Sequence, residues 1–268
     1  MKRNALTTLL LFLLLLPAKA QQEPTDDTRH ITRATLYGVG FSSVFDTYLS
    51  PQTYKGVEFR VSRESRKMTP WLDGNISRQV LFQANVAYTR NHVKNNITMA
   101  ALANWNYGLH YNFKLTPNFR LLAGGVADIN GGFVYNLRNG NNPAQARAYI
   151  NLDASGMAIW DVKIKEYPIQ LRYQLNIPFM GVMFMPHYAQ SYYEIFSLGY
   201  SKGVVNFTSL HNQPSLRQMI TADLPIGKVK MRLAYVWDAQ QAKINDIKTH
   251  AYSHIFMVGF VKELYLMK

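Results

Sequence analysis

The segment HYAQSYYEIF, residues 187–196, concentrates side chains that could bind a ligand or do chemistry. It contains three tyrosines, one acid and no lysine or arginine, in a chain rich in basic residues. A tyrosine combines an apolar ring with a hydroxyl group that needs a partner. One short helical turn over SYYEIF would place Tyr192 and Phe196 four residues apart on the same face. The segment is either a working end or a stopper for a polar opening, and we expect a stopper.

Candidates for binding, or for closing such an opening, come from this segment and from the loops and strand ends around it. They are Tyr188, Gln190, Ser191, Tyr192, Tyr193, Glu194, Arg217, His211, Asp238 and His250. We expect Glu194 to meet an inward-facing arginine, with Arg217 as the first candidate. The reason is that charges removed from water must be paired.

Catalysis would need a nucleophile or a base within hydrogen-bond reach of a partner. Side chains that could form a Ser–His–acid set or an aspartate–histidine site are His187, Ser191, Glu194, Ser209, His211, Asp238, Asp246, His250, Ser253 and His254. Asp238, Asp246 and His250 fall on adjacent predicted strand ends, so the second arrangement is geometrically feasible. Spacing alone shows no pairing, and the simpler interpretation of each is a polar loop residue. We therefore assign no catalytic residue and keep an enzyme as the alternative.

Metal, cofactor and nucleic-acid sites have little support in the sequence. His250 and His254 are four residues apart, which on a strand separates them by about 13 Å, too far for one ion. No glycine-rich phosphate loop follows a strand and opens a helix. Basic residues are scattered along the chain, which is not typical of a nucleic-acid interface. We predict no metal, no cofactor and no nucleic-acid partner.

The elements that position these residues are strands. From Thr35 onward apolar and polar residues alternate with a period of two, as in strands with two different faces. VEFRVSRES, for example, places Val57, Phe59 and Val61 opposite Glu58, Arg60 and Ser62. The predicted strands are 33–46, 54–66, 76–90, 97–113, 118–136, 147–163, 168–178, 214–224, 228–240 and 250–266.

The lengths of these strands indicate a membrane protein. Several exceed the roughly 9–11 residues that a tilted strand needs to cross a bilayer, whereas strands of soluble sandwiches are shorter. Short turns alternate with longer polar loops such as DTYLSPQTYKG and DAQQAKINDIKTH, as in outer-membrane barrels. We predict an all-β fold, a transmembrane up-and-down antiparallel β-barrel of about ten strands with a long extracellular loop at 179–213. Pairing of GVVNFTSLHN inside the membrane would raise the number to twelve.

The N-terminus predicts export. Lys2 and Arg3 precede a short apolar run, and Ala18-Lys19-Ala20 forms a small-x-small cleavage site. We divide the chain into a cleaved signal peptide at 1–20, a periplasmic N-terminal segment at 21–32 and a barrel at 33–268. Without the signal peptide the net charge falls from +13 to +10, because three basic residues and no acid are lost. Such a chain suits an anionic lipid surface.

Several segments together resemble a family of outer-membrane barrels of unknown function. They are DTYLSP with YKG, YGLHYN, RNGNNPAQA, AQSYYEIFS, PSLRQM, QQAKIN and YSHIFMVGFV. The similarity extends over nearly the whole mature chain in the same order. It differs at Ala189, where the family segment has glycine, and this affects a local turn. The resemblance implies the outer membrane of a Gram-negative cell, and it carries over no catalytic residue.

Charges of both signs occupy the predicted inward faces. They are Glu58, Arg60, Arg120, Asp128, Asp153, Asp161, Arg172, Arg217, Asp223, Lys230, Arg232 and Asp238. A barrel of ten strands is narrow, so we favour a lumen filled by paired charges over a polar conduit. We predict a small transport, binding or envelope-structural barrel with a plugged lumen, whose partners are outer-membrane lipids, lipopolysaccharide and the barrel-assembly machinery. The alternative is an outer-membrane hydrolase or lipid-modifying enzyme with a site at the extracellular rim.

Overall fold

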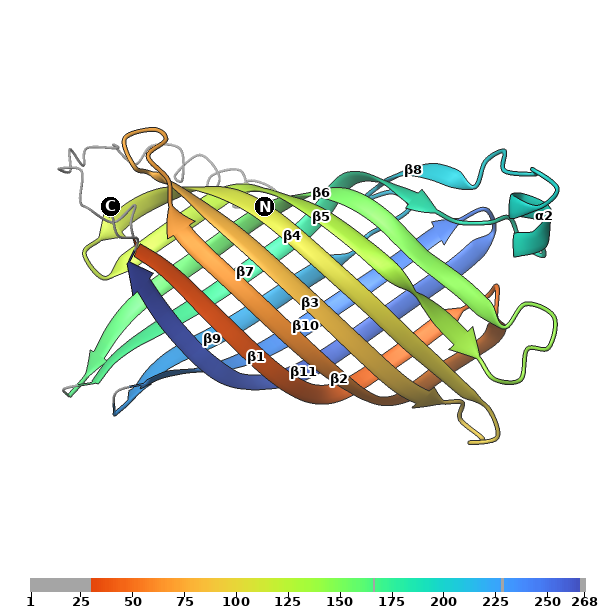
Figure 1. Ribbon diagram of the computed structural model, residues 1–268, viewed down its shortest axis with the longest axis horizontal. Helices are drawn as coiled ribbons and strands as arrows, with labels where there is room; N and C mark the ends of the chain where they lie inside the picture. The colour runs from red at the N-terminus through yellow and green to blue at the C-terminus, as the bar shows by residue number, and fades with distance from the viewer. Residues whose placement is uncertain (1–29, 166, 228, 266–268) are drawn as a thin grey trace, which may run out of the picture.

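The computed structural model describes residues 30–165, 167–227 and 229–265, which form an antiparallel sheet closed into a barrel (Figure 1). The strands are β1 (His30–Asp46), β2 (Ser50–Met68), β3 (Ile76–Arg90), β4 (Ile97–Thr116), β5 (Phe119–Asn136), β6 (Ala144–Ile164), β7 (Tyr167–Phe184), β8 (Val205–Ser209), β9 (Leu216–Ile226), β10 (Val229–Ile244) and β11 (Ile247–Tyr265). A five-residue helix, α2 (Tyr192–Phe196), lies between β7 and β8. Within these described ranges no helix is long and apolar enough to cross a membrane.

Ten strands make the closed wall. The ring runs β1 to β7 and then β9, β10 and β11, and the pairing of β1 with β11 closes it. β8 pairs with the last residues of β7, Met180–Phe184, while β9 pairs with the earlier part of β7, Gln170–Asn176. β8 therefore continues the line of β9 along β7 without widening the ring. The prediction of ten strands is confirmed, and the twelve-strand alternative is wrong.

The two ends of the barrel differ. The described chain begins and ends at one end, which we call the terminal end, where the turn at 117–118 joins β4 to β5 (Figure 1). At the other, the distal end, lie the connections 91–96 and 137–143 and the segment from 185 to 204 with α2. The distal connections are longer on the whole, as the sequence predicted.

Three predicted loops contain more strand than expected. β2 already begins at Ser50, and β10 and β11 are joined by the two residues Asn245 and Asp246, with φ of 51° and 61°. Two residues at positive φ form the tight hairpin turn that suits the twist of the strands. β7 continues to Phe184, so 179–184 belongs to the wall rather than to the predicted loop at 179–213. Polar residues concealed the pairing at the start of β2 and between β10 and β11, whereas the added residues of β7, FMGVMF at 179–184, are apolar and follow Pro178.

The wall carries exposed apolar side chains on its outer face and buried polar side chains on its inner face. On β3, Phe82, Val86 and Tyr88 are exposed on the outer face, whereas Gln79 and Gln83 are buried in the lumen. A soluble protein would bury such apolar side chains, because their burial drives folding in water. An apolar exterior around a polar interior is typical of a transmembrane barrel. The predicted signal peptide lies outside the described residues, and β1 includes residues 30–32 of the predicted N-terminal segment.

Candidate functional site

A cluster of ion pairs around Glu64 lies in the lumen nearer the terminal end. The Arg172 guanidinium donates to both Glu64 carboxylate oxygens, at 2.6 and 2.8 Å, and Arg232 pairs with the same carboxylate. Arg232 also donates to Asp223 at 2.6 and 2.7 Å. β2 and β7, which carry Glu64 and Arg172, are five strands apart in either direction around the ring. The Glu64–Arg172 contact therefore joins opposite walls.

A second cluster, around Asp238, fills the lumen farther toward the distal end. One Asp238 oxygen accepts from Arg60 at 3.0 Å and from Arg217 at 3.1 Å. Arg60 also donates to Glu58, and Arg217 donates to Asn104 of β4 at 2.8 Å. The cavity beside this cluster has a volume of about 30 Å³, which is the space of roughly one water molecule. Asp238, Arg60, Glu58 and Arg217 are thus paired, whereas Asp128 nearby accepts from the Asn104 and Asn106 amides and one buried oxygen of Asp153 has no hydrogen-bond partner among the described residues.

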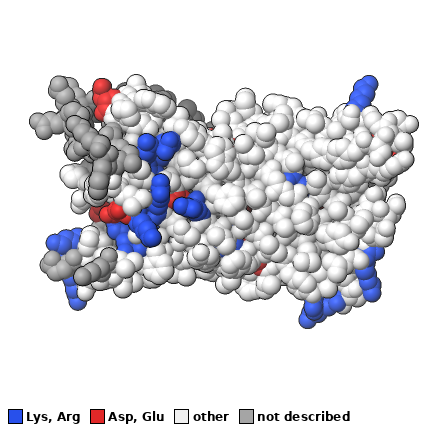
Figure 2. Space-filling model, viewed as in Figure 1, with Lys and Arg blue, Asp and Glu red and all other residues white. Residues whose placement is uncertain are grey.

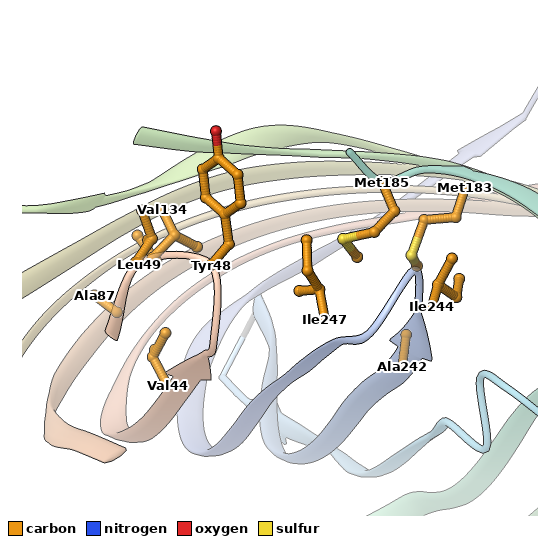
Figure 3. Close-up of a cluster of buried hydrophobic side chains, with 11 residues drawn as sticks. Val44, Tyr48, Leu49, Ala87, Val134, Met183, Met185, Ala242, Ile244 and Ile247 are labelled. Carbon is orange, nitrogen blue, oxygen red and sulfur yellow. The ribbon is translucent and has the colours of Figure 1, made fainter. Parts of the chain in front are cut away.

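An apolar layer covers the polar clusters at the distal end. It comprises Val44, Tyr48, Leu49, Ala87, Ala100, Val134, Met183, Met185, Ala242, Ile244 and Ile247, all buried (Figure 3). Figure 3 labels ten of these side chains, which come from several strands and from the turn at Tyr48. We call this set the distal plug. These buried apolar side chains fill the lumen at a level separate from that of the ion pairs.

Residues 185–204, which we call the cap segment, lie over the plug. The Tyr192 hydroxyl accepts from the Ala146 backbone N–H at 2.6 Å and donates to Gln145 at 2.9 Å. Tyr48 donates to the Gln190 carbonyl at 2.8 Å, and burial raises the pKa of Tyr48 to about 12. Tyr192 stacks on Phe196 with centroids 6.1 Å apart, so the predicted helical turn with both rings on one face is confirmed.

Glu194 does not reach Arg217, so that predicted contact is wrong. Ser191 is the N-cap of α2, and its backbone N–H and hydroxyl donate to the Glu194 carboxylate at 2.7 and 2.8 Å. These two hydrogen bonds hold the pKa of Glu194 below its usual range. Arg217 instead meets Asp238 inside the barrel. A capping box satisfies Glu194 locally, which leaves no need for a distant cation.

Among the other residues of the predicted stopper, Gln190 makes hydrogen bonds within the cap segment, whereas Tyr188 and Tyr193 are exposed. The Gln190 side chain donates to the Tyr200 carbonyl at 2.7 Å and accepts from the His187 N–H. Tyr188 and Tyr193 are 63% and 65% exposed, so they do not enter the lumen. Of the three tyrosines in the segment, Tyr192 alone contacts the plug.

The described residues do not assemble a Ser–His–acid set. Ser209 Oγ lies 2.5 Å from His211 Nδ1 in an exposed turn, and His211 contacts no acid. Ser253 donates to Glu58 at 2.6 Å, inside the lumen. His254 lies on the outer face, where its Nδ1 is 2.7 Å from the Tyr235 hydroxyl.

The predicted aspartate–histidine site is absent from the described structure as well. Asp238 faces the lumen, whereas His250 lies on the outer face of β11, stacked on Tyr252 with ring centroids 4.4 Å apart. Successive residues of a strand point to opposite faces, and these two residues fall on opposite faces of the wall. Among the residues that the structure describes, no group of three or more histidine, aspartate or glutamate residues could hold a metal ion.

Residues that the sequence analysis missed include Glu64 and Arg66 in the lumen and Asp46 and Arg147 near the plug. Arg147 pairs with Asp46 at 2.9 Å, and the Asp46 carboxylate also accepts from the Tyr48 backbone N–H at 3.0 Å. The alternation that places Glu58, Arg60 and Ser62 inside continues to 64 and 66, so the signal for the first two was present. Nothing in the sequence indicates that Arg147 and Asp46 meet, because β6 and β1 are far apart along the chain.

Comparison with known proteins gives a family without an assigned function. A family model described as protein of unknown function (DUF3316) matches residues 6–268. No curated protein matches the chain.

Solved structures with a similar arrangement are outer-membrane proteins. The transport unit of the autotransporter AIDA-I from Escherichia coli aligns with a TM-score of 0.48 and 9% identity, covering 95% of this chain and 94% of that one. The outer membrane protease OmpT from Escherichia coli aligns with a TM-score of 0.47 and 9% identity, over 93% and 99%. An outer membrane channel from Pseudomonas putida F1 aligns with a TM-score of 0.37 and 8% identity, over 91% and 100%.

Proposed function

The chain belongs to the family of proteins of unknown function DUF3316, and for this member we propose a closed, non-conducting outer-membrane barrel. Its role is then structural or binding, exerted through its outer wall and its distal cap rather than through a pore. The terminal end faces the periplasm and the distal end the exterior.

The observation that carries this proposal is the Glu64–Arg172 contact between opposite walls. An ion pair that reaches across the lumen leaves no room for solute at that level. It is buried, with side-chain exposures of 4% and 2%, and its carboxylate also accepts from Gln79 at 2.6 Å. The Asp238 cluster and the distal plug close the lumen at two further levels.

The outer wall supports the membrane position. On β3, Arg78 and Arg90 point outward, and all outward residues between them are apolar. Twelve residues at about 3.3 Å each, tilted by about 40°, span about 30 Å, which matches the hydrocarbon core of a bilayer. Figure 2 shows the same distribution on one face, with Lys and Arg toward the two ends and a largely white band between them.

Planar-bilayer conductance of the purified protein tests the proposal. We expect no stepwise current from the intact protein or from a variant in which residues 187–202 are replaced by a short Gly–Ser linker. A porin inserted under the same conditions is the positive control. Defined conductance steps from the intact protein would overturn the proposal. Steps from the linker variant alone would place the seal in the cap and overturn the role given to Glu64 and Arg172.

A hydrolase at the distal rim is the second candidate, favoured by the distance of 2.5 Å between Ser209 and His211. A serine nucleophile needs a histidine that a third group orients. In the described structure His211 has no acid partner, so this pair fits a turn better than an active site. Phospholipid hydrolysis by the purified protein, lost in Ser209→Ala, would instead support the enzyme.

A further inference from the structure

A groove on the outer wall lies where β2 and β3 reach the distal end. Its volume is about 720 Å³, and its walls come from the start of β2 and from the connection after β3. Three of its lining residues are basic, Lys55, Arg90 and Lys94, and a histidine, His92, lies among them. Three others, Val57, Tyr88 and Val93, are apolar or aromatic and exposed.

The connection that forms one side of the groove has a defined shape. Asn91 is buried, and its side-chain oxygen accepts from the backbone N–H groups of Asn95 and Asn96 at 3.0 and 3.1 Å. The Asn91 amide donates to Gln52 on β2 at 2.9 Å. These hydrogen bonds hold the turn that carries His92 and Lys94 in one conformation, so this side of the groove has a defined shape.

The cations of the groove have no acidic partner among the described residues. Lys55 and Arg90 are directly opposite in the β2–β3 register, a position where like charges destabilise a sheet. The Arg90 guanidinium donates to the Tyr88 hydroxyl at 3.1 Å and lies 5.4 Å from the centroid of its ring. The described acids of the strands, in contrast, all belong to lumen-facing positions. An anion from outside the chain would supply the missing counter-charge.

Apolar residues continue the groove toward the middle of the membrane. Directly beyond the Lys55–Arg90 pair, Val57 lies opposite Tyr88, and Phe59 then lies opposite Val86. All four are exposed on the outer face. The surface changes from cationic to apolar within one pair of residues, as the boundary between lipid headgroups and acyl chains requires.

We propose that this groove binds a phosphorylated lipid of the outer leaflet, a lipopolysaccharide. Its lipid A phosphate lies among Lys55, Arg90 and Lys94, and an acyl chain follows the column from Val57 to Phe59. The inference rests on the proposed orientation, with the distal end outward. The inference does not depend on whether the lumen conducts. Failure to bind the lipid would contradict this inference alone, and an open pore would contradict the closed barrel alone.

Binding of diphosphorylated lipid A to the purified full-length protein in detergent tests the inference. The variant carries Lys55→Gln, Arg90→Gln and Lys94→Gln. The matched control carries Arg33→Gln, Arg63→Gln and Lys262→Gln, which removes the same charge from outward positions at the terminal end. Since a cation near a lipid surface contributes a severalfold gain, we expect Kd to rise at least about tenfold in the groove variant and less than about twofold in the control.

Two further probes complete the test. Lipid A without phosphates should bind the intact protein and the groove variant with the same weak affinity. Equal losses in both triple variants, or phosphatidylglycerol binding as tightly and through the same three cations, would overturn the inference. Heat-modifiable migration in gels checks folding. If the triple variant does not fold, Lys94→Gln in the exposed turn provides the same comparison on its own.

Discussion

Replacing Glu64 by glutamine should destabilise the barrel strongly. Glu64 is 3% exposed and neutralises two guanidinium groups, those of Arg172 and Arg232. Glutamine keeps the shape but leaves Arg172 without a carboxylate partner inside the lumen. Breaking a buried pair by removing one partner costs about 3–5 kcal/mol, and we expect the free energy of unfolding to fall by that amount.

Urea unfolding of the protein refolded into detergent, followed by tyrosine and tryptophan fluorescence, measures this loss. The double variant Glu64→Gln with Arg172→Gln removes both charges and should regain part of the stability, because two amides can bond to each other. Asp73→Asn, in an exposed turn, is the control and should change stability by less than about 0.5 kcal/mol. A loss below about 1 kcal/mol in Glu64→Gln, with no recovery in the double variant, would refute the reasoning.

Two further predictions concern the cap segment. Ala189 has a φ of 65°, and a left-handed backbone costs a residue with a Cβ about 1–2 kcal/mol. Ala189→Gly should therefore stabilise the cap by about 1 kcal/mol. Proteolysis within 187–202 should become slower, and unchanged proteolysis would contradict this. The depressed pKa of Glu194 means that its bond to the Ser191 N–H persists above the ordinary pKa of 4.5 and is lost as pH falls through the lower, folded value. The exchange protection of that amide should therefore fall in acid and stay constant in Glu194→Gln, and the same acid step in both proteins would show that Glu194 is not its cause.

The fold was predictable because each strand repeats one physical signal. Apolar residues recur at every second position on the outer face of most strands, although the inner faces of β1 and β11 also carry buried apolar residues such as Leu36, Ile255 and Met257. The number of segments with this period equals the number of wall strands. The residues at which the strands end were harder to predict from the sequence. Gln240 and Gln241 suggest a loop, yet β10 continues through them to Ile244, which fills the distal plug.

Contacts across the lumen could not be predicted from the sequence. Which residues face each other across a barrel depends on the stagger of the closed ring, and alternation carries no information on stagger. Glu64 and Arg172 are 108 residues apart, and neither position indicates the other. The Glu194–Arg217 prediction was wrong because two groups of one nearby residue, the backbone N–H and hydroxyl of Ser191, satisfy the Glu194 carboxylate locally.

The most direct test of a closed lumen uses the absence of cysteine from the chain. Ser62 is 1% exposed, its hydroxyl has no partner, and it lies between Arg60 and Glu64 on the lumen face of β2. Ser62→Cys in the folded protein should resist a small, water-soluble methanethiosulfonate reagent, whereas Asn95→Cys in an exposed turn should react quickly, and both should react after unfolding. Modification of folded Ser62→Cys at the rate of Asn95→Cys would contradict the account.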